Sequence, residues 1–347
     1  MSIQSKFLKF HDAIKLGRKD PEYNNARQKD DSITASIKER FRLDGYPVID
    51  DFIQGSLATS TAIREKGQDF DIDRAIVIES SAAPENPITP KLAVLEVLEA
   101  RGFKHAKIKK PCVTADYKSE NLHIDIPVYR QYENGQYELA VGKRLSDENN
   151  REWAMSAPVE LIDWVKSYNK DVAYASEKHD QFRRLVRYLK RWRNYTFADE
   201  VRRKIFSIGI TVMVKECFVS SVDNEGFADD LAALKLTVSA ILASPWYFTS
   251  LGEGKYNVRV SLPVGTRRDI FDGSSVVTGT QFRNRLAALL KTLESAVNED
   301  DESKQCELLR SEFGEDFPEG KSTLPLKNMS KNAVYATSGA VGTSQGA

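Results

Sequence analysis

Two apolar segments of this chain carry aspartates in their interiors, and this feature constrains the fold more than any other. Asp71 and Asp73 alternate with apolar residues in the segment 69–79. A third aspartate, Asp125, interrupts a second apolar segment at 122–131. Runs of this length, rich in Ile and Val, predict buried strands. Because alternate side chains of a strand point to one face, Asp71 and Asp73 are expected to project together.

Carboxylates on a shared face repel each other unless a cation lies between them. An Asp-x-Asp pair by itself is more typical of a turn or of a solvated strand face. Here apolar residues flank all three aspartates, and a Gly-Ser pair, Gly55 and Ser56, precedes the first segment. Mg²⁺ is commonly bound by a few carboxylates, with water and substrate phosphates completing its shell. The pattern therefore predicts metal-dependent phosphoryl or nucleotidyl transfer.

Bulk composition excludes several classes of protein. A chain of 347 residues is long enough for two domains, each with its own core. Its 50 Lys and Arg residues balance 50 Asp and Glu residues, so stable nucleic-acid binding is not expected. The three cysteines lack CxxC spacing, which argues against a zinc site or a disulfide framework. No apolar run reaches membrane-spanning length and no signal-peptide core is present, so we expect a cytoplasmic protein without membrane contacts.

The spacing of apolar residues changes character near residue 157. Before it, strands and helices alternate, with helices expected at 1–20, 22–43 and 92–100 and strands at 48–54, 69–79, 103–117 and 122–131. After it the periodicity is helical, with helices expected at 158–168, 176–195, 200–220, 226–243, 278–298 and 302–313. We therefore expect an α+β fold in which a helical lobe packs against a sheet lobe and leaves a cleft between them.

The Gly-Ser pair, the Asp-x-Asp strand and the later single-Asp strand together resemble the motifs of polymerase-β-like nucleotidyltransferases. Within that superfamily the chain resembles the bacterial CD-NTases, relatives of cyclic GMP-AMP synthase and oligoadenylate synthase that act in anti-phage CBASS signalling. The segments that carry this closer resemblance are SAPVELIDW (156–164), LVRYLKRW (185–192), KIFSIGI (204–210) and SEFGEDFP (311–318). The resemblance covers about residues 52–318.

The resemblance implies a division of the chain into three parts. Residues 1–155 are expected to form a nucleotidyltransferase lobe with a mixed sheet, including a long N-terminal helix that acts as a spine across both lobes. Residues 156–318 are expected to form the helical lobe, with the active site in the cleft. Residues 319–347 are rich in small and polar residues and are expected to be a disordered tail.

The resemblance also assigns roles to the motif residues. Asp71, Asp73 and Asp125 are expected to be catalytic and to bind two Mg²⁺ ions, with Mn²⁺ as a substitute. Asp125 is also placed to accept the proton of the attacking ribose hydroxyl. The triphosphate is expected to contact a glycine that permits close backbone approach, a serine that donates hydrogen bonds and the residue before them: Gln54, Gly55 and Ser56.

Two residues of the helical half are assigned to the triphosphate by resemblance alone. Lys190 matches the helical lysine of the family, although the basic residues Arg183, Arg187, Lys190 and Arg191 are also compatible with a solvated helix face. Ser207 matches the family's serine, although its place at the start of an apolar helix also suits a helix N-cap.

The function implied by the resemblance is the joining of NTPs, ATP among them and GTP or another NTP as a partner, into a cyclic di- or trinucleotide with release of pyrophosphate. The product would be a second messenger that activates a separate effector in anti-phage defence. An alternative is another nucleotidyltransferase of the superfamily, which adds a nucleotide to a small molecule or an RNA acceptor. A different class is a binding protein that keeps the fold without chemistry, which three intact aspartates disfavour. The small residues of the tail also suit a companion ubiquitin-ligase-like enzyme that acts on the C-terminus.

Overall fold

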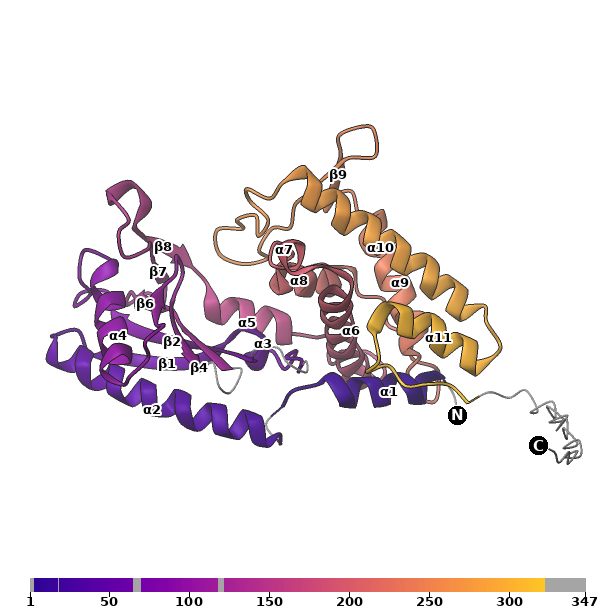
Figure 1. Ribbon diagram of the computed structural model, residues 1–347, viewed down its shortest axis with the longest axis horizontal. Coiled ribbons are helices and arrows are strands. Elements are labelled where there is room, and N and C mark those ends of the chain that lie inside the picture. The colour runs from indigo at the N-terminus through magenta and orange to yellow at the C-terminus, as the bar shows by residue number, and fades with distance from the viewer. Residues whose placement is uncertain (1–2, 18, 65–69, 118–121, 322–347) are drawn as a thin grey trace, which may run out of the picture.

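Strand β2 (Phe70–Glu79) is the centre of the first lobe and carries the Asp-x-Asp pair. The computed structural model describes residues 3–17, 19–64, 70–117 and 122–321, and it has two lobes side by side (Figure 1). The sheet lobe is drawn in indigo to magenta, and most of the helical lobe in rose to yellow. Helix α5 (Pro158–Lys166) lies where the two meet. This is the expected α+β fold.

The sheet has eight strands in the order β3-β4-β5-β2-β6-β7-β8, with β1 paired to β2. Strand β2 runs parallel to β5 and β6 and antiparallel to β1, so the sheet is mixed. The other strands are β1 (Val48–Gln54), β3 (Lys107–Ile108), β4 (Val113–Tyr117), β5 (Leu122–Ile126), β6 (Val128–Gln131), β7 (Tyr137–Val141) and β8 (Glu152–Ser156). The strand predicted at 122–131 is divided at Pro127, whose missing N–H interrupts the ladder.

Helices cover one face of this sheet. The core there contains Ile33, Ile37 and Phe41 of α2 (Pro21–Leu43), together with alternate residues of β2 and the apolar side of α4 (Ile88–Ala100). Alternation along β2 turns its two aspartates to the other face. Helix α2 packs on α4 and β2, within the sheet lobe, and therefore is not the spine across both lobes that the resemblance implied.

The helical lobe is larger than predicted, because the N-terminal helix belongs to it. Phe7, Phe10 and Ile14 of α1 (Ile3–Ile14) are buried in its core, so the prediction that residues 1–155 form one lobe is wrong at this end. The other elements of the chain's second half are α6 (Ala175–Thr196), α7 (Asp199–Arg202), α8 (Ser207–Cys217), α9 (Asp230–Ala243), β9 (Phe248–Ser250), β10 (Tyr256–Val258), α10 (Val276–Val297) and α11 (Glu302–Phe313). Figure 1 shows α1 running beneath α6 and α11.

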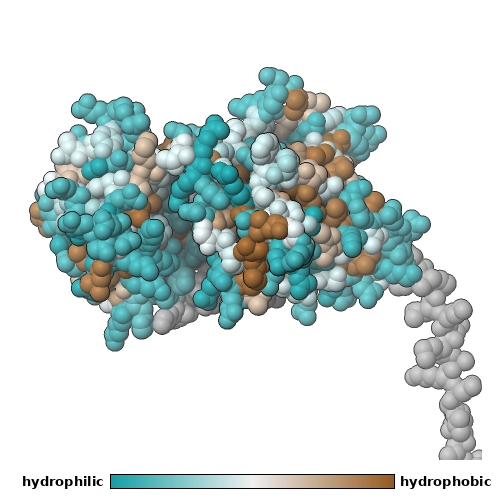
Figure 2. Space-filling model, turned by 90° about the horizontal axis from the view of Figure 1, so that it is seen from above, coloured by the Kyte–Doolittle hydropathy of each residue, from teal (hydrophilic) through white to brown (hydrophobic). Residues whose placement is uncertain are grey.

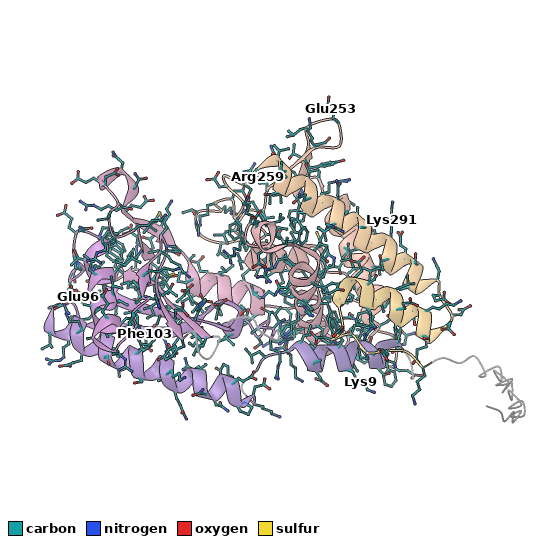
Figure 3. The ribbon with its side chains drawn as sticks, in the orientation of Figure 1. Lys9, Glu96, Phe103, Glu253, Arg259 and Lys291 are labelled. Carbon is teal, nitrogen blue, oxygen red and sulfur yellow. The ribbon has the colours of Figure 1, made fainter. Side chains whose placement is uncertain are left out.

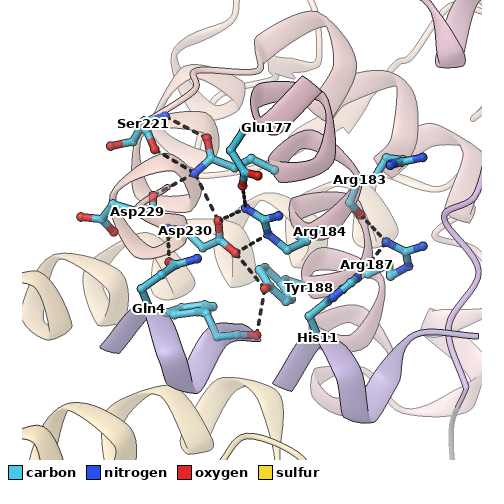
Figure 4. A network of polar contacts seen from close by, with 12 residues as sticks. Gln4, His11, Glu177, Arg183, Arg184, Arg187, Tyr188, Ser221, Asp229 and Asp230 are labelled. Carbon is cyan, nitrogen blue, oxygen red and sulfur yellow. Dashed lines mark hydrogen bonds and ion pairs between the residues drawn. The ribbon is translucent and has the colours of Figure 1, made fainter. Parts of the chain in front are cut away.

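A buried polar network holds α1, α6 and α9 together (Figure 4). Asp230 of α9 is fully buried and accepts hydrogen bonds from Arg184 of α6 at 2.7 and 3.0 Å. Tyr188 Oη lies 2.9 Å from Asp230 Oδ2 and 3.0 Å from the carbonyl of Phe7. Asp230 is both ion-paired and hydrogen-bonded, so the free-energy cost of burying its charge is offset. The network thereby fixes α6 against α1 and α9.

Residues at the edge of the predicted tail are hydrogen-bonded to the helical lobe. The Glu319 carbonyl accepts a hydrogen bond from Lys6 at 2.5 Å, and the Lys321 amide donates to Glu302 at 3.2 Å. Residues 322–347, the rest of the tail, lie outside the described residues. In the part of the chain that the structure describes, no helix is both long and apolar enough to cross a membrane.

Candidate active site

A cleft of about 800 Å³ opens between the two lobes. Figure 2 shows the surface from above, hollowed between them. Every residue predicted for the site lines this cleft: Gln54, Gly55, Ser56, Asp71, Asp73 and Asp125 from the sheet lobe, and Lys190 and Ser207 from the helical lobe. Charged residues such as Glu96 and Lys291 lie on the outer sides of the two lobes (Figure 3). The structure therefore brings together residues that are up to 153 positions apart in sequence.

The three aspartates are adjacent because β2 and β5 run parallel. Asp73 stands directly across from Asp125 in the register of the two strands, and Asp71 is paired with His123. Residues in register on neighbouring strands share a face, so all three carboxylates point into the cleft. The Asp71 side chain is 64% exposed, whereas that of Asp125 is 23% exposed.

Asp73 is the most electrostatically perturbed of the three. Burial raises its pKa to about 7, and the neighbouring charges of Asp125 and Asp71 add to this rise. A carboxyl group that is costly to ionise in the folded protein has a strong preference for a bound cation. Lysines at 109 and 190 oppose the rise without cancelling it.

Two residues that the sequence did not single out hold Asp125 in place. Thr114 of β4, its cross-strand partner, donates a hydrogen bond to Asp125 Oδ1 at 2.5 Å. Lys109 Nζ lies 3.2 Å from the same oxygen. Lys109 lies in the segment 103–117, for which the sequence predicted a strand and no role at the site. The sequence alone could not identify Thr114, because its place on the same face as Asp125 follows only from the pairing of β4 with β5.

Gly55 follows Gln54 at the end of β1, next to Asp73. Its φ is +66°, and a Cβ atom placed on it would stand 2.1 Å from Asp73 Oδ2. Glycine is therefore required both by the backbone conformation and by the carboxylate. Gln54 is paired with Asp73 in register, and its side-chain carbonyl accepts a hydrogen bond from Tyr129 at 3.0 Å. Ser56 follows in the short helix α3 (Gly55–Ala58) and faces the cleft.

Lys190 is not part of a solvated face. It is 4% exposed, and its Nζ donates to the carbonyl of Thr61 at 3.2 Å and to the hydroxyl of Thr61 at 3.1 Å. Burial lowers its pKa to about 7, and the positive charges of Arg193 and Arg187 lower it further. The negative charge of a triphosphate would favour the ammonium form.

Ser207 lies at the start of α8 but does not cap it. Phe206 is the N-cap residue, and Ser207 instead accepts a hydrogen bond from Arg193 Nη1 at 2.6 Å. Arg193 also donates to the Ile205 carbonyl at 3.0 Å and lines the cleft. The position of Arg193 three residues after Lys190, on the same face of α6, was the sequence signal that could have identified it.

The carboxylates of Asp71, Asp73 and Asp125 fit a divalent cation that is shared with substrate. Within residues 3–321, as far as they are described, no group of three or more His, Cys, Asp or Glu side chains is arranged to hold a metal ion without substrate. Mg²⁺ is usually held by one or two carboxylates plus water and substrate phosphates, and an open carboxylate face suits that mode. The raised pKa of Asp73 indicates that the face lacks sufficient positive charge by itself.

Comparison with known proteins agrees with this geometry. Residues 50–129, which contain the Gly-Ser pair and all three aspartates, match the family described as Cyclic GMP-AMP synthase DncV-like, nucleotidyltransferase domain. This segment of the chain is similar to the DncV-like nucleotidyltransferases. A curated relative, the cyclic GMP-AMP synthase of Escherichia albertii, is 28% identical over 192 residues. That match covers 52% of this chain and 39% of the relative, so it spans less than half of the relative's length.

Solved structures share the fold of this chain. The CD-NTase CdnG of Bradyrhizobium diazoefficiens matches with a TM-score of 0.68 at 16% identity, over 90% of this chain and 96% of that chain. The cyclic AMP-GMP synthase DncV of Vibrio cholerae matches with a TM-score of 0.56 at 19% identity, over 78% of this chain and 69% of that chain. The predicted polymerase-β-like fold and the resemblance to bacterial CD-NTases are confirmed.

Proposed function

We propose that this protein joins nucleoside triphosphates, ATP among them, into a cyclic di- or trinucleotide with release of pyrophosphate. The observation that carries the proposal is the cleft itself. Three carboxylates on adjacent strands face a buried lysine of the opposite lobe, with a glycine that is in contact with the central carboxylate. Two relatives support the choice of substrate and product. The Escherichia albertii protein is named a cyclic GMP-AMP synthase, and the Bradyrhizobium structure is a complex with GTP.

In the proposed reaction a ribose hydroxyl attacks the α-phosphorus of an NTP, and pyrophosphate leaves. Asp125 accepts the hydroxyl proton, and Thr114 holds its carboxylate in the orientation seen here. Lys190 and Ser207 bind the triphosphate from the helical lobe, while Gly55 and Ser56 approach it from the sheet lobe. Divalent cations held by the three aspartates would lower the pKa of the attacking hydroxyl and neutralise charge on the leaving group.

The cleft is large enough to hold a nucleotide. At about 800 Å³ it lies in the upper part of the range of roughly 300–1,000 Å³ that small-molecule sites occupy. Apolar residues of α5, such as Leu161 and Ile162, line it beside the polar groups, and they offer a surface for a base.

The test is incubation of the purified protein with labelled NTPs and Mg²⁺, followed by phosphatase treatment. A cyclase yields a phosphatase-resistant product from NTPs alone, because a cyclic oligonucleotide has no terminal phosphate. A product that forms only after a small molecule or an RNA acceptor is added would instead establish the alternative transferase. If no NTP is consumed with Mg²⁺ or Mn²⁺, the chain is a binding protein and the proposal is wrong.

A role in anti-phage defence is part of the same proposal. The cyclic product would activate a separate effector, and a companion ubiquitin-ligase-like enzyme would act on the C-terminal residues, which end in Gly346 and Ala347. Deletion of these two residues is expected to leave the purified enzyme active and to prevent conjugates in cells that contain the companion enzyme. Conjugates that persist after the deletion would contradict the proposal that a companion enzyme acts on the C-terminal residues.

A further inference from the structure

Three consecutive backbone carbonyls of the sheet lobe accept hydrogen bonds from two cations of α6. Arg187 Nη2 donates to Ser60 O at 2.5 Å, and Arg187 Nε donates to Ala62 O at 3.1 Å. Between them, Lys190 Nζ donates to Thr61 O at 3.2 Å. The segment 60–62 is therefore bound to the helical lobe through each of its three backbone carbonyls.

Burial of the Arg187 side chain at this position costs free energy. It is only 8% exposed, and within the described residues no carboxylate lies within ion-pair distance of it. Its remaining partners are also neutral: His11 Nε2 of α1 at 3.0 Å and the carbonyl of Arg183. Burial lowers the pKa of Arg187 to about 10. A buried charge without a counter-ion destabilises a fold, so a local role is needed to explain it.

The segment that Arg187 holds is joined to the glycine turn of the site. The Thr61 amide donates to Ser56 O at 2.9 Å, and the Thr59 hydroxyl donates to Gly55 O at 3.1 Å. Ser60 adopts a left-handed conformation with φ of +55°, which is costly for a residue that is not glycine. The surrounding contacts must therefore stabilise this conformation, and Arg187 provides the contact at Ser60 itself.

We propose that Arg187 is a positioning residue for nucleotide binding: it fixes the segment 60–62, and through it the Gly55-Ser56 turn, against α6. The turn and Lys190 then face the same triphosphate from opposite lobes. The proposal rests on the function proposed above. Arginine suits this role because its planar fork can donate to the carbonyls of residues 60 and 62 at once, whereas lysine offers a single point charge.

The inference is tested with Arg187→Met, Arg187→Lys and the control Arg183→Met. Arg183 lies one turn earlier on α6, is paired with Asp180 within the helix and contacts no residue of the segment 60–62. The first measurement is amide hydrogen exchange in the nucleotide-free protein. Peptides that cover residues 56–62 should exchange faster in both Arg187 variants and should be unchanged in Arg183→Met.

The second measurement is steady-state kinetics with ATP. Arg187→Met should raise KM roughly tenfold or more, as expected when charge-assisted hydrogen bonds that hold a binding turn are lost, with a smaller change in kcat. Arg187→Lys should lie between wild type and Arg187→Met, and Arg183→Met should stay within about twofold of wild type. If Arg187→Met fails to fold, as judged by Tm, Arg187→Lys decides the question.

The two proposals fail in different ways. Wild-type protein that consumes no NTP would refute the proposed function, and hydrogen exchange and ATP binding would still decide the role of Arg187. Exchange and KM that match wild type in the folded Arg187 variants would overturn the positioning role while leaving the proposed function intact. Faster exchange with an unchanged KM would also overturn it, because the segment would then be irrelevant to the nucleotide.

Discussion

Gly55 and Asp73 are in such close contact that a single added methyl group would occupy the position of the carboxylate, since a Cβ on Gly55 would lie 2.1 Å from Asp73 Oδ2. The turn after β1 thus contacts the central strand β2 through Gly55 and Asp73. Any shift of Asp73 also alters its spacing to Asp125, which stands across from it. The glycine is therefore part of the carboxylate geometry as well as of the backbone turn.

Gly55→Ala should lower kcat/KM by about a hundredfold, because a displacement of about 1 Å at a reacting centre can cost that much. Gly45→Ala is the matched control, since Gly45 also has a positive φ, +88°, but no atom within 4 Å of its added Cβ. It should lose about 1 kcal/mol of stability and keep full activity. Steady-state kinetics and Tm of both variants check this. Equal activity of the two variants would show that the contact with Asp73 is unimportant.

Asp73→Asn should stabilise the metal-free protein in a pH-dependent manner. The pKa of Asp73 is raised from about 3.8 to about 7, so the fold disfavours the ionised carboxyl. The resulting destabilisation is absent below about pH 3.8, grows as the pH rises and is complete above pH 7. Because asparagine cannot ionise, the substitution removes this destabilisation. It should raise the free energy of unfolding by a few kcal/mol at pH 8 and by almost nothing at pH 4. Thermal melts in EDTA measure it.

Asp50→Asn is the control for that experiment, because Asp50 is exposed on β1 and does not line the cleft. Its Tm should differ from wild type by a similar small amount at both pH values. A gain in Asp73→Asn that is the same at pH 4 and pH 8 would mean that the cost of ionising the buried Asp73 carboxyl is not its cause.

Nucleotide affinity should fall as the pH rises above 7, because Lys190 then loses its proton. Its pKa in the free protein is lowered to about 7, and the triphosphate binds the charged form. The affinity should decrease by up to about tenfold per pH unit until the pKa of the bound state is reached. Lys190→Arg stays charged throughout, so its affinity should change much less between pH 7 and 9. Calorimetry with a non-hydrolysable ATP analogue compares the two proteins, and parallel pH profiles would refute the assignment.

Thr114→Val should reduce kcat by about tenfold and leave KM nearly unchanged. The hydroxyl donates to Asp125 Oδ1 at 2.5 Å, and its loss leaves Lys109 as the remaining contact of that oxygen, at a cost of about 1–2 kcal/mol. Thr114→Ser retains the donor and should recover most of the activity. A valine variant with wild-type kcat would show that Asp125 is oriented by other contacts.

The residues of the site that lie close together in sequence could be predicted, because they depend on the alternation of side chains along a strand and on the spacing of the motifs. Asp71 and Asp73 lie on one face for the same reason that Ile72 lies in the core, and period two is visible in the sequence. Gly55 was predicted as the point where the backbone approaches the triphosphate, which stays a prediction. Its close approach to Asp73 Oδ2 was not predicted from the sequence.

Residues that act across the two lobes could not be predicted in this way. Arg187 and Lys190 have the same periodicity as surface cations, and only the packing of α6 against residues 60–62 buries them. Lys109 was similarly indistinguishable from Lys104, Lys107 and Lys110 in the same predicted strand. The placement of α1 in the helical lobe depends on contacts of Phe7 and Phe10 with residues far along the chain, and no local pattern encodes those contacts.

The most direct test of the central claim is pyrophosphate release from a mixture of the four NTPs with Mg²⁺, by wild type and by Asp71→Asn, Asp73→Asn and Asp125→Asn. Wild type should release pyrophosphate continuously, each single substitution should lower the rate by several powers of ten, and Asp50→Asn should match wild type. Each variant must retain a wild-type or higher Tm, which shows that the fold is intact. Wild type that releases no pyrophosphate, or a cleft variant that releases it at the wild-type rate, would contradict the claim that these three carboxylates perform nucleotidyl transfer.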